Sequence, residues 1–110
     1  MPEHVSDARL QEILKEDPGM IMVDLWADWC MPCKAIEPYL ESASREFGIR
    51  LLKLNVDENP MTPATYGVMS IPTVLCFRDG KLVGKIVGAK PKMKIYQEIK
   101  SIFKLDEKGG

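Results

Sequence analysis

Hydrophobic residues in this chain switch repeatedly between two spacings, and this alternation restricts the possible folds more than any other feature. Residues 20–25 form a nearly continuous apolar run, which is typical of a strand buried on both faces of a sheet. Farther along, apolar residues recur at the helical spacing of Ile36, Leu40, Ala43 and Phe47. Such segments follow in the order helix, strand, helix, strand, helix, strand, strand, helix, so the sequence predicts an α/β fold.

Capping and turn residues set the limits of these elements. Ser6 or Asp7 can cap the first helix, and Gly48 follows the second helix as a C-terminal cap. Asp79-Gly80 is a strong signal for a hairpin between the last two strands. The predicted strands are 20–25, 51–56, 73–77 and 81–87, and the predicted helices lie within 7–16, 33–47, 60–66 and 95–103.

One domain accounts for the whole chain. Its length of 110 residues falls in the usual range of a single domain. A strand, a crossover helix and a second strand form a parallel pair, whereas a tight hairpin forms an antiparallel pair. We therefore predict one domain over residues 1–110, with a mixed sheet that carries helices on its faces and a flexible tail at residues 106–110.

Charge and hydropathy argue against two classes of partner. The net charge of −1 provides no global field that would hold nucleic acid, although residues 81–110 are basic and residues 1–80 acidic. The longest uncharged stretch, residues 59–77, contains three prolines and does not suit a membrane span. Residues 1–10 lack the pattern of a signal peptide. The sequence thus predicts a cytoplasmic protein without nucleic-acid or membrane partners.

Two of the three cysteines lie where a buried strand is followed by a helix, in the segment Cys30-Met31-Pro32-Cys33. Only a thiolate attacks a disulfide, and the amides and dipole of a helix N-terminus stabilise that anion. Pro32 suits the first helical turn, where its missing N–H leaves no bond unmade. We expect Cys30, which precedes the helix, to be an exposed nucleophile and Cys33 to be the resolving thiol.

Other uses of the cysteines are less well supported by the sequence. A zinc site needs about four ligands, and the chain offers only Cys30, Cys33, Cys76 and His4, with no second pair at ligand spacing. We therefore expect no metal, although a metal site and a pair of purely structural thiols stay open as alternatives. Cys76 lies in an apolar run and is predicted to be a core thiol, with a regulatory thiol as the alternative.

Four separated segments resemble the thioredoxin family, in the family's order. They are residues 26–34 (WADWCMPCK), 53–57 (KLNVD), 71–73 (IPT) and 87–89 (VGA). Met31 departs from the family, whose members usually carry glycine between the first cysteine and the proline. The resemblance implies an α/β thioredoxin fold, with a central mixed β-sheet of four or five strands flanked by four helices on both faces.

The resemblance also implies a function and partners. The protein would be a general protein-disulfide reductase without a cofactor, a monomer that acts on protein disulfides and is recharged by a thioredoxin reductase. Cys30 would form a mixed disulfide with the substrate, and attack by Cys33 would release it and leave a Cys30–Cys33 disulfide. The alternatives are a disulfide oxidase or isomerase, and a non-catalytic thioredoxin-fold module that binds a partner or a metal.

Further residues receive roles through the same resemblance. Asp24 would be a buried carboxylate that accepts the proton of Cys33, since burial raises the pKa of an acid, and Lys53 would offset its charge. Pro72 would follow a cis peptide bond and place the backbone of Ile71 beside the cysteines. The residues expected to form an apolar docking surface for substrates are Trp29, Met31, Pro32, Ile71, Pro72, Gly88 and Ala89.

Overall fold

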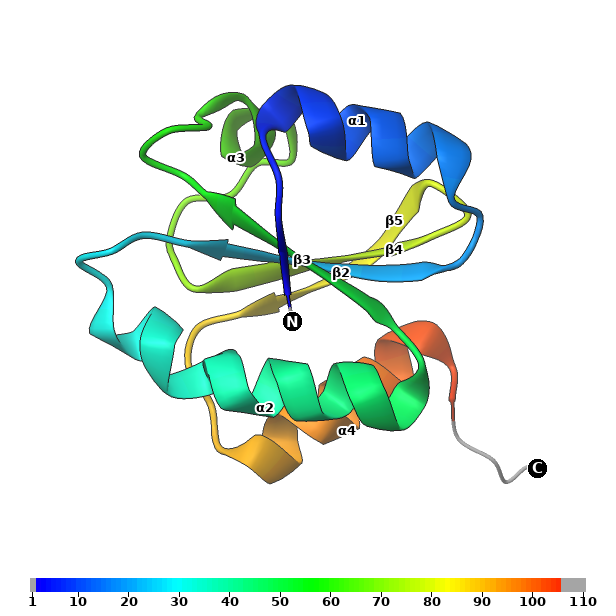
Figure 1. Cartoon of the computed structure of the whole chain (residues 1–110). Coiled ribbons are helices and arrows are strands. Elements are labelled where there is room, and N and C mark those ends of the chain that lie inside the picture. Colours follow the sequence, from blue (N-terminus) through cyan, green and yellow to red (C-terminus); the bar gives the residue numbers. More distant parts are fainter. Residues whose placement is uncertain (1, 106–110) are drawn as a thin grey trace.

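The computed structural model describes residues 2–105, which form a five-stranded sheet and four helices (Figure 1). The strands are β1 (Glu3–His4), β2 (Met20–Trp26), β3 (Arg50–Asn55), β4 (Thr73–Arg78) and β5 (Lys81–Val87). The helices are α1 (Asp7–Glu16), α2 (Met31–Phe47), α3 (Met61–Thr65) and α4 (Lys92–Phe103). The expected tail at residues 106–110 lies outside the described residues.

The sheet is mixed, as predicted, and its order is β1-β3-β2-β4-β5. The first three strands of that order are parallel, whereas β4 is antiparallel to β2 and β5 is antiparallel to β4. Strand β2 therefore lies in the middle, and residues 21–25 are buried. This burial explains why the strand reads as a continuous apolar run, since both of its faces contact the core.

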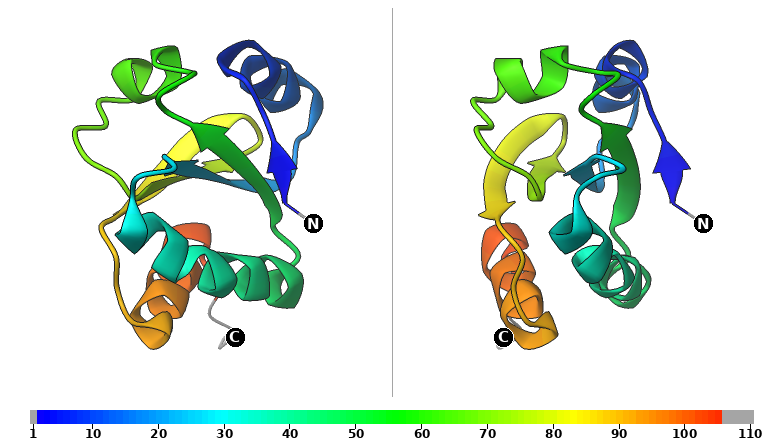
Figure 2. Two further views of the ribbon diagram at one scale, coloured as in Figure 1. Left: turned by 60° about the vertical axis from the view of Figure 1, so that its left-hand side comes forward. Right: turned by 90° about the vertical axis from the view of Figure 1, so that its left-hand side faces the viewer.

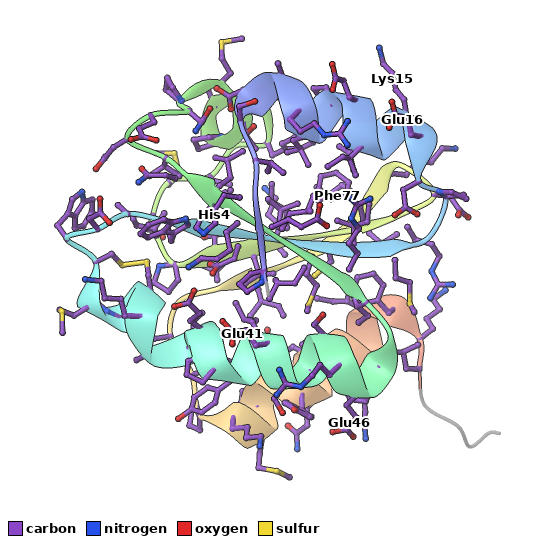
Figure 3. All side chains as sticks on the ribbon, in the orientation of Figure 1. His4, Lys15, Glu16, Glu41, Glu46 and Phe77 are labelled. Atoms are coloured by element: carbon purple, nitrogen blue, oxygen red, sulfur yellow. A yellow bond between two sulfur atoms is a disulfide. The ribbon has the colours of Figure 1, made fainter. Side chains whose placement is uncertain are left out.

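Helices cover both faces of the sheet. Figures 1 and 2 show α1 and α3 on one face and α2 and α4 on the other. The core under α1 contains Phe77 of β4 together with Leu10 and Ile13, and Figure 3 shows Phe77 between that helix and the sheet. The second core joins α2 and α4 to the sheet through residues such as Leu40 and Phe103. The two cores fix the end of β2 relative to the start of α2.

The sequence did not predict β1. This strand has only two residues, both exposed, and it pairs in parallel with Leu52 and Lys53 of β3. Arg50 reinforces the pairing through its ion pair with Glu3. A two-residue strand is too short to show any alternation of apolar and polar residues, so its formation depends on the tertiary partner.

The helices lack the features of a membrane span. Among residues 2–105, none of them combines the length and the apolar composition that crossing a bilayer requires.

Two glycines with left-handed backbones offer a matched test of the fold. Gly80 in the β4–β5 turn has φ 78°, and an added Cβ would lie 2.6 Å from the Leu14 carbonyl oxygen; Gly48 after α2 has φ 67° and open space around it. Gly48→Ala should lower the free energy of unfolding by about 1 kcal/mol through backbone strain alone. Gly80→Ala should cost about 3 kcal/mol, because strain and a backbone clash add. Urea unfolding measures both, and equal losses would contradict the close approach of Gly80 to the Leu14 carbonyl oxygen of α1.

Candidate active site

The cysteine pair lies at the N-terminus of α2, directly after β2 and its short loop. Cys30 is the N-cap of α2 and forms a disulfide with Cys33, which Figure 3 shows as a yellow bond at the start of that helix. The Cys33 amide donates to the Cys30 sulfur at 3.2 Å. The first turn holds no acidic residue, so the unpaired amides and the helix dipole favour a negative charge on sulfur.

The expectation that Cys30 is exposed is wrong for this disulfide form of the protein. Cys30 is 3% exposed and Cys33 is 2% exposed. Both pack with Ala27, and the partly buried side chains of Trp26 and Ile71 cover this cluster. Ile71 comes from a loop about forty residues away in the sequence, so the position of Cys30 before the helix could not reveal this cover.

Asp24 is a carboxylic acid in the middle of the sheet. Its side chain is 1% exposed, and its Oδ1 atom has no hydrogen-bond partner among the described residues. Burial raises the pKa of Asp24 to about 7 because the charged form loses its solvation; Lys53 opposes this rise, and Glu37 and Glu41 add to it. The carboxyl therefore changes its protonation near neutral pH.

Lys53, which the resemblance gave as the residue that offsets the charge of Asp24, is the register partner of Asp24 on β3, but its ammonium group contacts other residues. It forms an ion pair with Glu37 of α2 and lies 4.4 Å from the centre of the Trp26 ring. Glu37 was not among the predicted site residues. Its spacing of four residues from Cys33 places it on the same face of α2, and this was the signal available in the sequence.

The loop before β4 brings residues distant in the sequence together. The Ile71-Pro72 peptide bond is cis, and the Gly88 amide donates to the Pro72 carbonyl at 2.9 Å. Pro72 is buried, whereas Ala89 is exposed and Ile71 is partly exposed. The expectation that Pro72 contributes exposed surface is therefore wrong, because β4 begins directly after it in the centre of the sheet.

Exposed apolar side chains surround the disulfide. Trp29 is 67% exposed, Met31 is 69% exposed, and Pro32 beside them is also exposed. The Trp29 indole N–H donates to a carboxylate oxygen of Asp57 at 2.9 Å, which fixes the direction of the ring. A shallow groove begins at this ring, and its lining residues are Trp29, Val56, Pro63, Val68, Met69, Ser70 and Ile71.

Cys76 and the metal question are separate from this site. Cys76 in β4 is fully buried, which confirms the predicted core thiol, and burial raises its pKa to about 12. Its sulfur is therefore protonated and unreactive at neutral pH. Within residues 2–105, no group of three or more His, Cys, Asp or Glu side chains is arranged to hold a metal ion.

Comparison with known proteins gives a consistent result. The sequence model of the thioredoxin family matches residues 1–101. The chain belongs to the thioredoxin family. It is 41% identical to thioredoxin of Listeria monocytogenes over 90% of this chain and 96% of that one. It is 51% identical to thioredoxin of Staphylococcus aureus over 71% of this chain and 77% of that one.

A solved structure is also similar. A mutant thioredoxin from Halobacterium salinarum NRC-1 has a TM-score of 0.81 and 30% identity, covering 92% of this chain and 89% of that chain. The predicted thioredoxin fold is thus confirmed. As a thioredoxin, the chain is a protein-disulfide reductase that acts by dithiol–disulfide exchange through the Cys30–Cys33 pair, and neither the oxidase nor the binding-module alternative is favoured.

The raised pKa of Asp24 predicts how stability depends on pH. The carboxyl titrates at about 7 in the folded protein and near 3.8 when unfolded, so the folded state alone holds this proton between those values. The stabilisation is complete below about pH 4 and is lost as the pH rises to about 7. Asp24→Asn, which cannot ionise, should therefore be the more stable protein at about pH 8, by up to about 4 kcal/mol.

Urea unfolding of the oxidised proteins at about pH 4 and about pH 8 checks this. The advantage of Asp24→Asn should shrink as the pH falls. Asp28→Asn removes an exposed carboxylate nearby and should show no comparable gain at high pH. A difference between Asp24→Asn and wild type that is the same at both pH values would contradict the buried, proton-binding carboxyl.

Proposed function

We propose that Cys30 is the nucleophile and Cys33 the resolving thiol of this reductase. The observation that carries the proposal is the pairing of the N-cap thiol with a thiol in the first turn of α2. The Cys30 thiolate attacks one sulfur of a substrate disulfide, forms a mixed disulfide and releases one substrate thiolate. The Cys33 thiolate then attacks the Cys30 sulfur, closes the Cys30–Cys33 disulfide and releases the second. Two electrons and two protons pass to the substrate.

Asp24 serves this scheme as the proton acceptor for Cys33. A thiol must lose its proton before it attacks, and a buried thiol cannot give that proton directly to water. An acid with a pKa of about 7 is present in both forms at neutral pH, so it can accept a proton in one step and return it in the next. Lys53, through its charge, limits how far burial raises that pKa.

Substrates dock on the exposed surface around the disulfide. Trp29, Met31 and Pro32 supply apolar contact area at the start of α2. Gly88 adjoins the cis-proline loop through its hydrogen bond to Pro72, and the exposed Ala89 follows it. The backbone of Ile71 offers hydrogen bonds to an extended substrate segment, as a sheet edge does. Pro72 supports this loop from the core rather than contacting the substrate.

The partners and compartment follow from the same activity. After each cycle the protein holds a Cys30–Cys33 disulfide that a reductant must reopen, and a thioredoxin reductase is the partner that restores the dithiol. Protein disulfides are the substrates, and the protein works as a monomer. A cytoplasmic location suits this role, because a reducing compartment keeps the thiol pair available between cycles.

The reduction of insulin disulfides by dithiothreitol tests the assignment of the two thiols. The wild-type protein should accelerate the reaction, and Cys30→Ser and Cys33→Ser should each abolish that acceleration. When pre-reduced Cys33→Ser is mixed with insulin in the absence of dithiothreitol, it should instead accumulate a mixed disulfide, because no second thiol of the pair attacks the Cys30 sulfur to release it. Cys76→Ser is the control and should keep its activity. An inactive wild type, or an active Cys30→Ser variant, would contradict the scheme.

The exposed Met31 side chain allows a test of the docking surface. Met31→Ala removes apolar contact area worth about 1 kcal/mol, so the KM for insulin should rise about fivefold. The rate with a small soluble disulfide should stay unchanged, because such a substrate does not cover this surface. Met61→Ala is the control, since Met61 is 66% exposed but lines a different groove beside α1. Equal effects of the two substitutions on KM would argue against docking at Met31.

A further inference from the structure

An ion pair lies behind the cysteine pair, between α2 and the sheet. Glu37 extends from α2 and its carboxylate contacts the ammonium group of Lys53 on β3. The Lys53 side chain is 8% exposed and that of Glu37 is 29% exposed, so this pair is shielded from solvent on the lysine side. The Trp26 ring contacts the same ammonium group and holds it further in place. The lysine is therefore fixed by two partners.

Asp24 forms no salt bridge with this lysine, although the two residues occupy matching positions on neighbouring strands. Asp24 and Lys53 are paired in register on neighbouring strands, so their side chains belong to the same face of the sheet. Even so, no salt bridge joins them in the part of the chain that the structure describes, and the Asp24 Oδ1 atom has no partner. The ammonium group of Lys53 thus contacts Glu37 and the Trp26 ring and forms no salt bridge with Asp24.

We propose that Glu37 is a positioning residue for the reductase, because it holds the Lys53 ammonium group away from Asp24 and so leaves Asp24 able to take up a proton. Without Glu37, Lys53 would turn toward the buried carboxylate and keep it ionised. The importance of this arrangement for catalysis rests on the proposed role of Asp24 as proton acceptor. The effect on the titration of Asp24 does not depend on that role.

Among the residues that the structure describes, the charged groups that shift the pKa of Asp24 come from two elements, β3 and α2. Lys53 comes from β3, and Glu37 and Glu41 come from α2, which also carries the cysteines. Figure 3 shows Glu41 on the side of α2 that faces the sheet. The residue opposite Asp24 on β4 is Val74, which is uncharged. Glu41 acts on Asp24 only by its own field, because the structure pairs Lys53 with Glu37 and not with Glu41.

The titration of Asp24 in the oxidised protein tests the proposal. Carbon-13 NMR of labelled aspartate carboxyl carbons gives the midpoint, and Asp24→Asn assigns the signal. Glu37→Gln should lower the midpoint by about one pH unit or more, since an opposite charge that approaches a carboxylate favours its ionised form. Glu41→Gln is the matched control on the same helix, and it should lower the midpoint by a clearly smaller amount.

A double-variant cycle shows whether Glu37 acts through Lys53. Lys53→Met should raise the midpoint, and adding Glu37→Gln to that variant should then lower it clearly less than Glu37→Gln does when Lys53 is present, because only the direct field of Glu37 is left to lose. An equal change in the presence and absence of Lys53 would overturn the proposal, because Glu37 would act only by its own field. If Lys53→Met does not fold, equal changes in Glu37→Gln and Glu41→Gln overturn it.

Insulin reduction by Asp24→Asn, measured beside these titrations, separates this proposal from the proposed function. If Glu37→Gln lowers the Asp24 midpoint as expected but Asp24→Asn reduces insulin as fast as the wild type, the role of Asp24 is refuted and the effect of Glu37 on the titration still holds. No response of the midpoint, together with impaired reduction by Asp24→Asn, would refute only the role of Glu37.

Discussion

A carboxylic acid buried in the central strand is the constraint on which the rest of this site depends. Ionised groups cost several kcal/mol when they leave water, unless other charges or hydrogen bonds compensate them. Asp24 lies in β2, the most enclosed strand of the sheet, and lacks a hydrogen bond at Oδ1. Ionisation of Asp24 at high pH therefore destabilises the folded state. The same burial provides a group that exchanges a proton near neutral pH.

The cysteine pair and this carboxyl use two opposite electrostatic effects. The N-terminus of α2 favours a negative charge on the cysteine sulfur, whereas the core behind it disfavours a negative charge on the Asp24 carboxyl group. In the proposed mechanism, these two effects together favour the transfer of a proton from Cys33 to Asp24. Both effects require that β2 and α2 keep a fixed relative position, which the packing of helices on both faces of the sheet provides (Figure 2).

Much of this arrangement was predictable from the sequence because local patterns encode it. The apolar run of β2, the stripe of α2 and the Asp79-Gly80 turn correspond to elements that the structure contains. The two-residue β1 was missed, since it exists only through its pairing with β3. The parallel pairing of β2 with β3 followed from the crossover helix between them rather than from any residue contact.

The site was predictable in its residues but less so in its exposure and pairing. The motif placed Cys30 and Cys33 at the start of α2, and the resemblance gave Asp24 as a buried carboxylate, which the structure places in β2. Burial of Cys30 under Ile71 and burial of Pro72 depend on a loop distant in the sequence, so no local pattern reports them. Lys53 was predicted to act on Asp24, and Glu37 was not predicted, because Glu37 reaches Lys53 only once α2 packs on the sheet.

The rate at which Cys33 resolves a mixed disulfide, measured against pH, tests the central role of Asp24 most directly. A preformed mixed disulfide between Cys30 and a labelled peptide releases the peptide when Cys33 attacks. In the wild-type protein this rate should rise through a midpoint near the pKa of Asp24, about 7. In Asp24→Asn it should be about 100-fold lower at neutral pH and should lack that midpoint. Superimposable pH profiles would contradict the account.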